Sequence, residues 1–143
     1  MLEAIKDAWL WTGLEPVEVV VENKFGNVVV RDVDDKFWRI CPEEAELTLI
    51  AQTRSQLNAL WQDEDFRLDW LMLGLVHQAE QTLGALPVGK KYCLKTPGVL
   101  GGEYVVDNLG VISFEELIRF SGHLAQQLDG IADGSNIELA LIP

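Results

Sequence analysis

The sequence predicts an α+β fold: a mixed, mainly antiparallel sheet packed with about four helices. Two observations carry this prediction. Runs of β-branched residues between 17 and 51 are separated by short polar turns, and four other segments repeat apolar residues at helical spacing. A chain of 143 residues has the usual size of one domain, so we expect a single domain over 1–143. Its sheet would combine an N-terminal meander, a C-terminal hairpin and a last strand.

The first 51 residues predict one helix followed by the meander. Apolar residues recur at helical spacing from Leu2 to Thr12, and Gly13 follows as a C-terminal cap. The strand segments are VEVVVE, NVVVRD, FWRI and ELTLIA, and we expect turns at 23–26 and 33–36. This order of short strands and tight turns is typical of an antiparallel meander.

The central segment predicts two helices. Thr53 is placed to cap a helix that runs to Trp61, and the acidic group 63–65 precedes a longer helix from about Phe66 to Leu83. Apolar side chains occupy most of the circumference of that second helix. We therefore expect it to be surrounded by protein.

The stretch from Tyr92 to Leu128 predicts the C-terminal elements. A strand at 92–96 is followed by adjacent glycines at 101 and 102, a strand at 103–106 and a tight turn at 107–110. Ser113 and Glu116 form a capping box before a helix that reaches Leu128. Gly122 inside that helix indicates a close packing contact. Polar and apolar residues alternate over 136–142, which predicts the last strand.

The charge of the chain limits its partners. Its formal net charge is -12 with a pI near 4.4. Such a field repels nucleic acid and anionic membranes and favours encounter with a basic protein, so we expect no direct nucleic-acid or membrane binding. The N-terminus lacks the pattern of a signal peptide and no apolar run approaches 18 residues. These features favour a cytoplasmic protein.

The sequence motifs that could indicate a metal, phosphate or cysteine site are incomplete. Asp32, Asp34 and Asp35 lack the glycine and the closing glutamate of a calcium loop, and the GVLGG segment lacks the lysine of a phosphate-binding loop. Cys41 and Cys93 stand far apart without a CxxC motif, so we expect two buried, reduced thiols. We expect no catalytic residue, no metal site and no cofactor.

Several segments together resemble a known family: FGNVVVRD, FWRICPEE, DEDFRLDW, YCLKTPGVLGGEYVVDNLG and ISFEELIRFSGHLAQQ. The chain resembles the C-terminal domain of type VI secretion DNase-immunity proteins, which often follows a GAD-like domain. The resemblance implies a bacterial cytoplasmic protein that has no catalysis of its own. It would bind and neutralise a basic protein toxin, a nuclease effector.

Two sets of candidate site residues follow. A DNase presents basic groups to phosphate, so an inhibitor could cover them with exposed acids from turns and helix starts. The toxin-binding candidates are Asp34, Asp35, Glu43, Glu44, Asp63, Glu64 and Asp65. The alternative is a small-molecule-binding or regulatory domain that uses the glycine turn, with Gly101, Gly102, Glu103, Tyr104 and Asn108.

Overall fold

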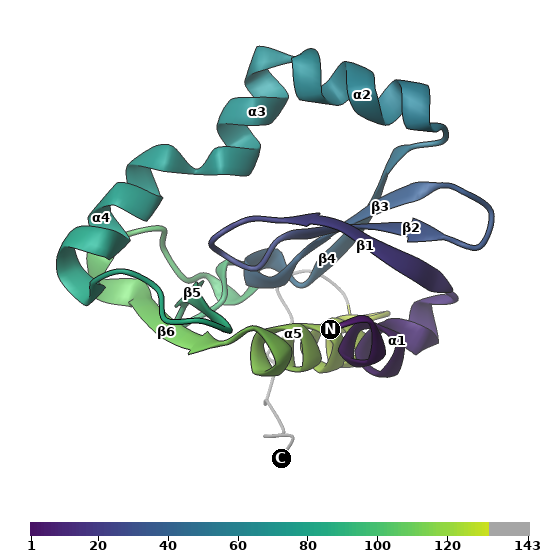
Figure 1. The fold of residues 1–143 in the computed structure, drawn as a ribbon. Coiled ribbons are helices and arrows are strands. Elements are labelled where there is room, and N and C mark those ends of the chain that lie inside the picture. Colours follow the sequence, from purple (N-terminus) through teal and green to yellow (C-terminus); the bar gives the residue numbers. More distant parts are fainter. Residues whose placement is uncertain (132–143) are drawn as a thin grey trace.

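A four-stranded antiparallel sheet in the order β1–β2–β3–β4 forms the centre of the molecule (Figure 1). The computed structural model describes residues 1–131, and the last strand expected at 136–142 lies outside them. The strands are β1 (Pro16–Glu22), β2 (Val28–Asp32), β3 (Phe37–Cys41) and β4 (Glu46–Ala51). The predicted meander is therefore confirmed.

Two short polar turns connect β1 to β2 and β2 to β3. Asn23 accepts hydrogen bonds from the backbone of Phe25 and Asn27 within the first turn. The Asp32 carboxylate accepts bonds from the backbone N–H groups of Asp34 and Lys36 within the second. Side chains of this type stabilise turns by bonding to their own backbone, which is why both turns were predictable.

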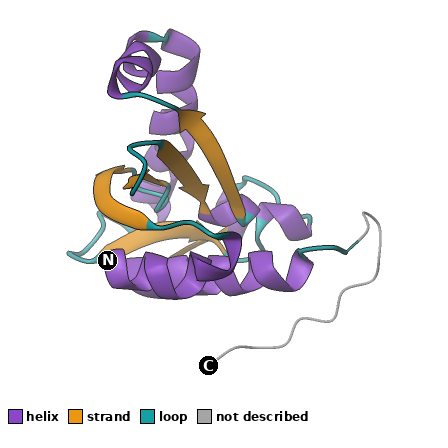
Figure 2. Cartoon of the chain, turned by 90° about the vertical axis from the view of Figure 1, so that its right-hand side faces the viewer, coloured by secondary structure: helices purple, strands orange, loops and turns teal. Residues whose placement is uncertain are grey.

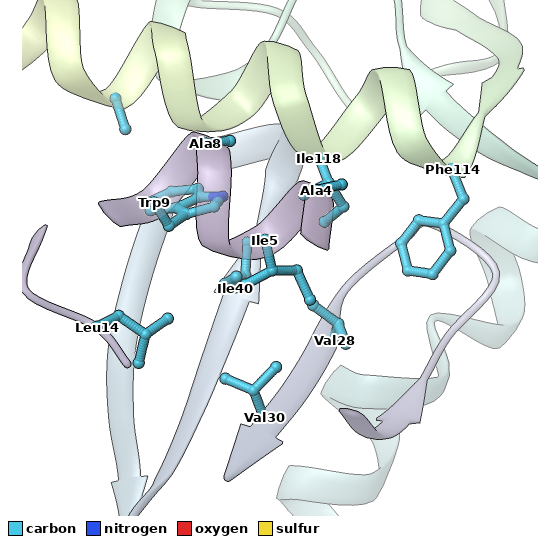
Figure 3. Close-up of a cluster of buried hydrophobic side chains, with 11 residues drawn as sticks. Ala4, Ile5, Ala8, Trp9, Leu14, Val28, Val30, Ile40, Phe114 and Ile118 are labelled. Atoms are coloured by element: carbon cyan, nitrogen blue, oxygen red, sulfur yellow. The ribbon is translucent and has the colours of Figure 1, made fainter. Parts of the chain in front are cut away.

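Two helices, α1 (Leu2–Trp9) and α5 (Phe114–Leu128), lie side by side along one face of the sheet (Figures 1 and 2). Figure 3 shows Ile5 and Trp9 of α1 between the strands and α5. The Ser113 hydroxyl accepts a bond from the Glu116 backbone at 3.1 Å, which confirms the predicted start of α5. Gly122 faces Ala8, and a Cβ at Gly122 would lie 2.4 Å from the Ala8 carbonyl oxygen, so the predicted close contact is confirmed.

On the opposite side, three helices form an arch above the sheet (Figure 1). They are α2 (Arg54–Gln62), α3 (Glu64–Leu71) and α4 (Leu73–Leu83). The start of α2 at the Thr53 cap is confirmed. The single helix predicted over 66–83 is wrong, because the chain breaks at Met72, whose φ of 49° is left-handed. Asn23 donates to the Trp70 carbonyl at 2.8 Å beside this break.

The expected burial of the second helix is also wrong. Leu68, Leu71 and Leu73 are 56%, 46% and 59% exposed. The break at Met72 splits the apolar circumference, so only part of it faces the protein. Trp70 and Val76 are buried, in two different clusters.

The C-terminal hairpin consists of β5 (Lys90–Leu94) and β6 (Leu109–Ser113), paired antiparallel. The strand predicted at 103–106 is wrong: these residues belong to the long connection between β5 and β6. Asn108 fixes that connection, since its amide donates to the carbonyl oxygens of Thr96 and Glu103 and accepts from the Thr96 backbone. These bonds take the place of strand pairing.

Candidate functional site

A hollow of about 340 Å³ lies between the outer face of β3–β4 and the arch. Alternation along each strand places Arg39 and Cys41 of β3 on this face, together with Glu46, Thr48 and Ile50 of β4. Asp69 and Met72 of the arch close one side, and Tyr104 of the β5–β6 connection closes the other. The remaining lining residues are Glu43 and Glu44, which follow β3.

A chain of polar contacts crosses the wall of the hollow. Arg39 Nη1 donates to Asp69 Oδ2 at 2.7 Å, and Arg39 Nε donates to Asn27 Oδ1 at 3.0 Å. Asn27 Nδ2 in turn donates to both carboxylate oxygens of Glu43, each at 3.0 Å. The guanidinium carbon of Arg39 also lies 5.1 Å from the ring centroid of Trp70. This network joins the sheet to the arch.

Tyr104 and Glu44 form a second contact at the edge of the hollow. The Tyr104 hydroxyl donates a short hydrogen bond to Glu44 Oε1. Tyr104 is 43% exposed, so its burial is partial, but this partial burial raises the pKa of the hydroxyl and the bond to Glu44 raises it further. The phenol therefore stays protonated at neutral pH and acts as a donor. Gly98 packs closely against Glu44, since a Cβ added at Gly98 would meet the carboxylate of Glu44.

The cysteines are free thiols in ordinary protonated form. Burial raises the pKa of Cys41, with a further contribution from the neighbouring Glu43. Burial also raises the pKa of Cys93. A nucleophilic cysteine requires a lowered pKa, so neither side chain has the property of a reactive thiolate. Both are free, and the burial expected for them is wrong, because each is only half-buried.

The hollow is acidic and its polar groups are largely satisfied by one another. Four carboxylates face one guanidinium in its lining: Glu43, Glu44, Glu46 and Asp69 against Arg39. The histidines are not in the lining, and His77 is exposed on α4. Within residues 1–131 no group of three or more histidine, cysteine or acidic side chains is arranged to hold a metal ion. The arrangement favours recognition of a cationic group over proton transfer.

The toxin-binding candidates fall at three separate places. Asp34 and Asp35 are exposed in the turn before β3, whereas Glu44 follows the other end of that strand and is half-buried. Three more candidates, Asp63, Glu64 and Asp65, are exposed where α2 meets α3, and the seventh is Glu43.

The exposure predicted for Glu43 is wrong. Its side chain is buried, with 6% of its surface exposed, and both carboxylate oxygens accept from Asn27. A buried carboxylate of this kind needs hydrogen-bond donors, and Asn27 supplies them. Glu43 is thus part of the interior of the protein.

The glycine turn is a packed connection. A Cβ at Gly102 would collide with the Thr96 carbonyl, so Gly102 permits a close backbone crossing. Asn108 uses its amide group on the backbone, while Gly101 and Glu103 are exposed outside the hollow. Of the five residues in the alternative set, only Tyr104 lines the hollow.

Arg39 and Asp69 are functional candidates that sequence reasoning missed. Alternation in FWRIC places Arg39 on the same face of the sheet as Phe37 and Cys41, and this pattern could have identified Arg39 from the sequence. Nothing in the sequence pairs Arg39 with Asp69, because the two residues are 30 positions apart and meet only in the folded structure.

The described elements define a small α+β protein with a strongly acidic composition. Residues 51–125 match the family model described as T6SS immunity protein Tdi1, C-terminal. The chain belongs to this family. The matched segment runs from the end of β4 through the arch and the C-terminal hairpin into α5. In the described part of the chain, no helix combines the length and the apolar character needed to cross a membrane.

One solved structure with a similar fold is the crystal structure of Atu4351 from Agrobacterium tumefaciens. It is 19% identical to this chain, with a TM-score of 0.57, over 85% of this chain. The match spans 62% of the Atu4351 chain. At this identity the likeness establishes a shared fold. A comparison with curated proteins gives no match.

Proposed function

We propose that this protein neutralises a secreted nuclease toxin by binding it in the bacterial cytoplasm, without catalysis. The observation that carries the proposal is membership in the T6SS immunity family, through a match that includes the whole arch. An immunity protein acts on a toxin, and a nuclease is the type of toxin that best suits the charge of this chain.

Electrostatics supports a nuclease as the partner. A nuclease must present cations to the phosphates of its substrate. This chain has a net charge of -12, and several of its basic side chains are already held in ion pairs, among them Lys24 with Glu80 and Arg119 with Asp7. The excess of carboxylates can therefore attract a basic surface and compete with nucleic acid for it.

The contact residues that we propose are the exposed acids of the sequence prediction. Glu64 and Asp65 form no ion pair within the described residues, and Asp34 likewise projects from its turn without one. Asp63 uses one oxygen to cap α3, and Asp35 pairs with Arg31. Because Glu43 is buried, it is no longer a contact candidate.

Co-expression tests this function. The gene for the protein is expressed together with each nuclease gene found near it in the genome, and growth is compared with that of cells expressing the nuclease alone. We expect growth to be restored, and an inactive form of the nuclease to elute with the protein in size-exclusion chromatography. Absence of both growth rescue and a complex would contradict the proposal.

A further inference from the structure

The arch carries three leucines whose side chains are about half exposed in the described chain. Leu68 and Leu71 lie on α3, and Leu73 begins α4. Residues three and four positions apart share one side of a helix, so Glu64, Leu68 and Leu71 lie opposite the inward-facing Phe66 and Trp70. We call the surface formed by Leu68, Leu71 and Leu73 the arch leucine face.

The arch leucine face is held rigidly from beneath. Trp61, Phe66 and Trp70 pack against one another with ring centroids 5.2 to 6.4 Å apart: Phe66 and Trp70 are stacked, and Trp61 meets both edge to face. Asn23 bonds to the Trp70 carbonyl, and Arg39 contacts both Asp69 and the Trp70 ring. A surface fixed in this way loses little conformational entropy when a partner binds it.

The backbone at the centre of this surface is in an uncommon conformation. Met72 has a φ of 49° and a ψ of 39°, a left-handed conformation that is unfavourable for a side chain with a Cβ. Such positions persist where the surrounding structure holds them, and they are frequent at binding sites. Leu73, the first residue of α4, follows this turn directly, two positions after Leu71.

The surroundings of the leucines are predominantly acidic. Asp63, Glu64 and Asp65 are exposed at the start of α3, and Arg67 is the exposed cation on the same helix. An apolar centre with a charged rim is the usual composition of a protein-binding surface. The rim here suits a basic partner.

We propose that the arch leucine face is the docking surface for the nuclease toxin, which would present an apolar groove bordered by basic side chains. This inference rests on the proposed function and specifies where the contact is made. The leucines supply the buried centre of the interface, and the acids of α3 guide the toxin to it.

The test uses the Leu68→Ser/Leu71→Ser double variant of the full chain. The matched control is Leu10→Ser, because Leu10 is 68% exposed on the other side of the sheet, beside α1. Binding of the inactive neighbouring-gene nuclease is measured by calorimetry, and thermal unfolding confirms that each variant is folded. Because central apolar contacts dominate most interfaces, we expect the double variant to bind about 30-fold more weakly or worse. The control is expected to bind like the wild type.

Three results would overturn the inference, and they can be told apart. If the folded double variant binds as tightly as the wild type, the toxin contacts another surface, while the proposed function stands. If the wild type does not bind the nuclease, the proposed function fails and the inference fails with it. If sedimentation shows that the wild type is a dimer that the double variant converts to a monomer, the face joins two copies of this chain instead.

Discussion

Among single residues, two glycines that lie in helices, Gly122 and Gly74, have opposite surroundings. Gly122 of α5 lies against the backbone of Ala8, whereas a Cβ at Gly74 of α4 would meet nothing within 4 Å. The first glycine permits close packing of α1 and α5. The second has no packing role in the described structure.

These surroundings predict opposite effects of the same substitution. Gly122→Ala should lower the free energy of unfolding by about 1 to 3 kcal/mol, because the added methyl group overpacks the contact with α1. Gly74→Ala should raise it by about 0.4 to 1 kcal/mol, because it restricts the unfolded chain. Urea denaturation measures both values. Equal effects of the two substitutions would show that Gly122 is not the point of closest approach.

Asp32 links stability to pH. Burial alone would raise its pKa, but hydrogen bonds from Trp38 and from the backbone of Lys36 and Asp34 outweigh burial, so the pKa lies below the ordinary value of 3.8. The unfolded state then binds the proton more readily than the folded state. The stability contributed by Asp32 is present above pH 3.8 and is lost as pH falls through the lower, folded pKa.

The Asp32→Asn variant tests this linkage. Asparagine retains an oxygen that can accept bonds in the turn but cannot ionise. We expect the unfolding free energy of the variant to fall less steeply than that of the wild type as the pH is lowered below 3.8, by urea denaturation. Parallel pH profiles for the two proteins would assign the acid sensitivity to other groups.

Among the helices and strands, the break between α3 and α4 is the main feature of the fold. Asn23 bonds to the Trp70 carbonyl, and it also accepts from Phe25 and Asn27 in its own turn. One side chain therefore connects the first hairpin to the arch. It positions the arch leucine face relative to the sheet.

Asn23→Ala should lower the free energy of unfolding by at least about 2 kcal/mol, because it leaves several buried backbone groups without a partner. The control is Asn58→Ala on α2, where the asparagine is exposed and alanine has the higher helix propensity. Chemical denaturation compares the two variants. A similar, small effect at both positions would mean that water replaces the bonds of Asn23.

Elements set by neighbouring residues were predictable, and those set by distant contacts were not. The cap at Ser113 and the turn at Asp32 depend on bonds within four residues. The break at Met72 lies beside a long-range contact, the hydrogen bond from Asn23 to the Trp70 carbonyl 47 positions away. The prediction of a strand at 103–106 was wrong for a related reason: the Asn108 side chain bonds to the backbone carbonyls of Thr96 and Glu103.

The candidate site was predictable only in part. Acidic turns and helix starts are visible in the sequence, and Asp63, Glu64 and Asp65 are exposed as expected. The burial of Glu43 depends on Asn27, a contact across the sheet that the sequence does not reveal. Likewise, the helical pattern of 66–83 predicted buried leucines, because it contained no sign that the helix divides.

At the scale of the whole molecule, the surplus of negative charge is expected to control the rate of association. Reversing Asp34, Glu64 and Asp65 to Lys should slow binding of the inactive nuclease by about tenfold at low salt and flatten its salt dependence. Stopped-flow fluorescence measures the rate. The control reverses Glu3, Glu15 and Asp129, which are also exposed, and so changes the net charge equally. Equal slowing in both variants would attribute steering to net charge and remove the specific role of these three acids.

The most direct test of toxin neutralisation is a titration of the neighbouring-gene nuclease with the purified protein, with cleavage of duplex DNA as the readout. We predict that cleavage falls to background once the protein matches the nuclease in concentration. Full cleavage in the presence of a large excess of folded protein would contradict the immunity function.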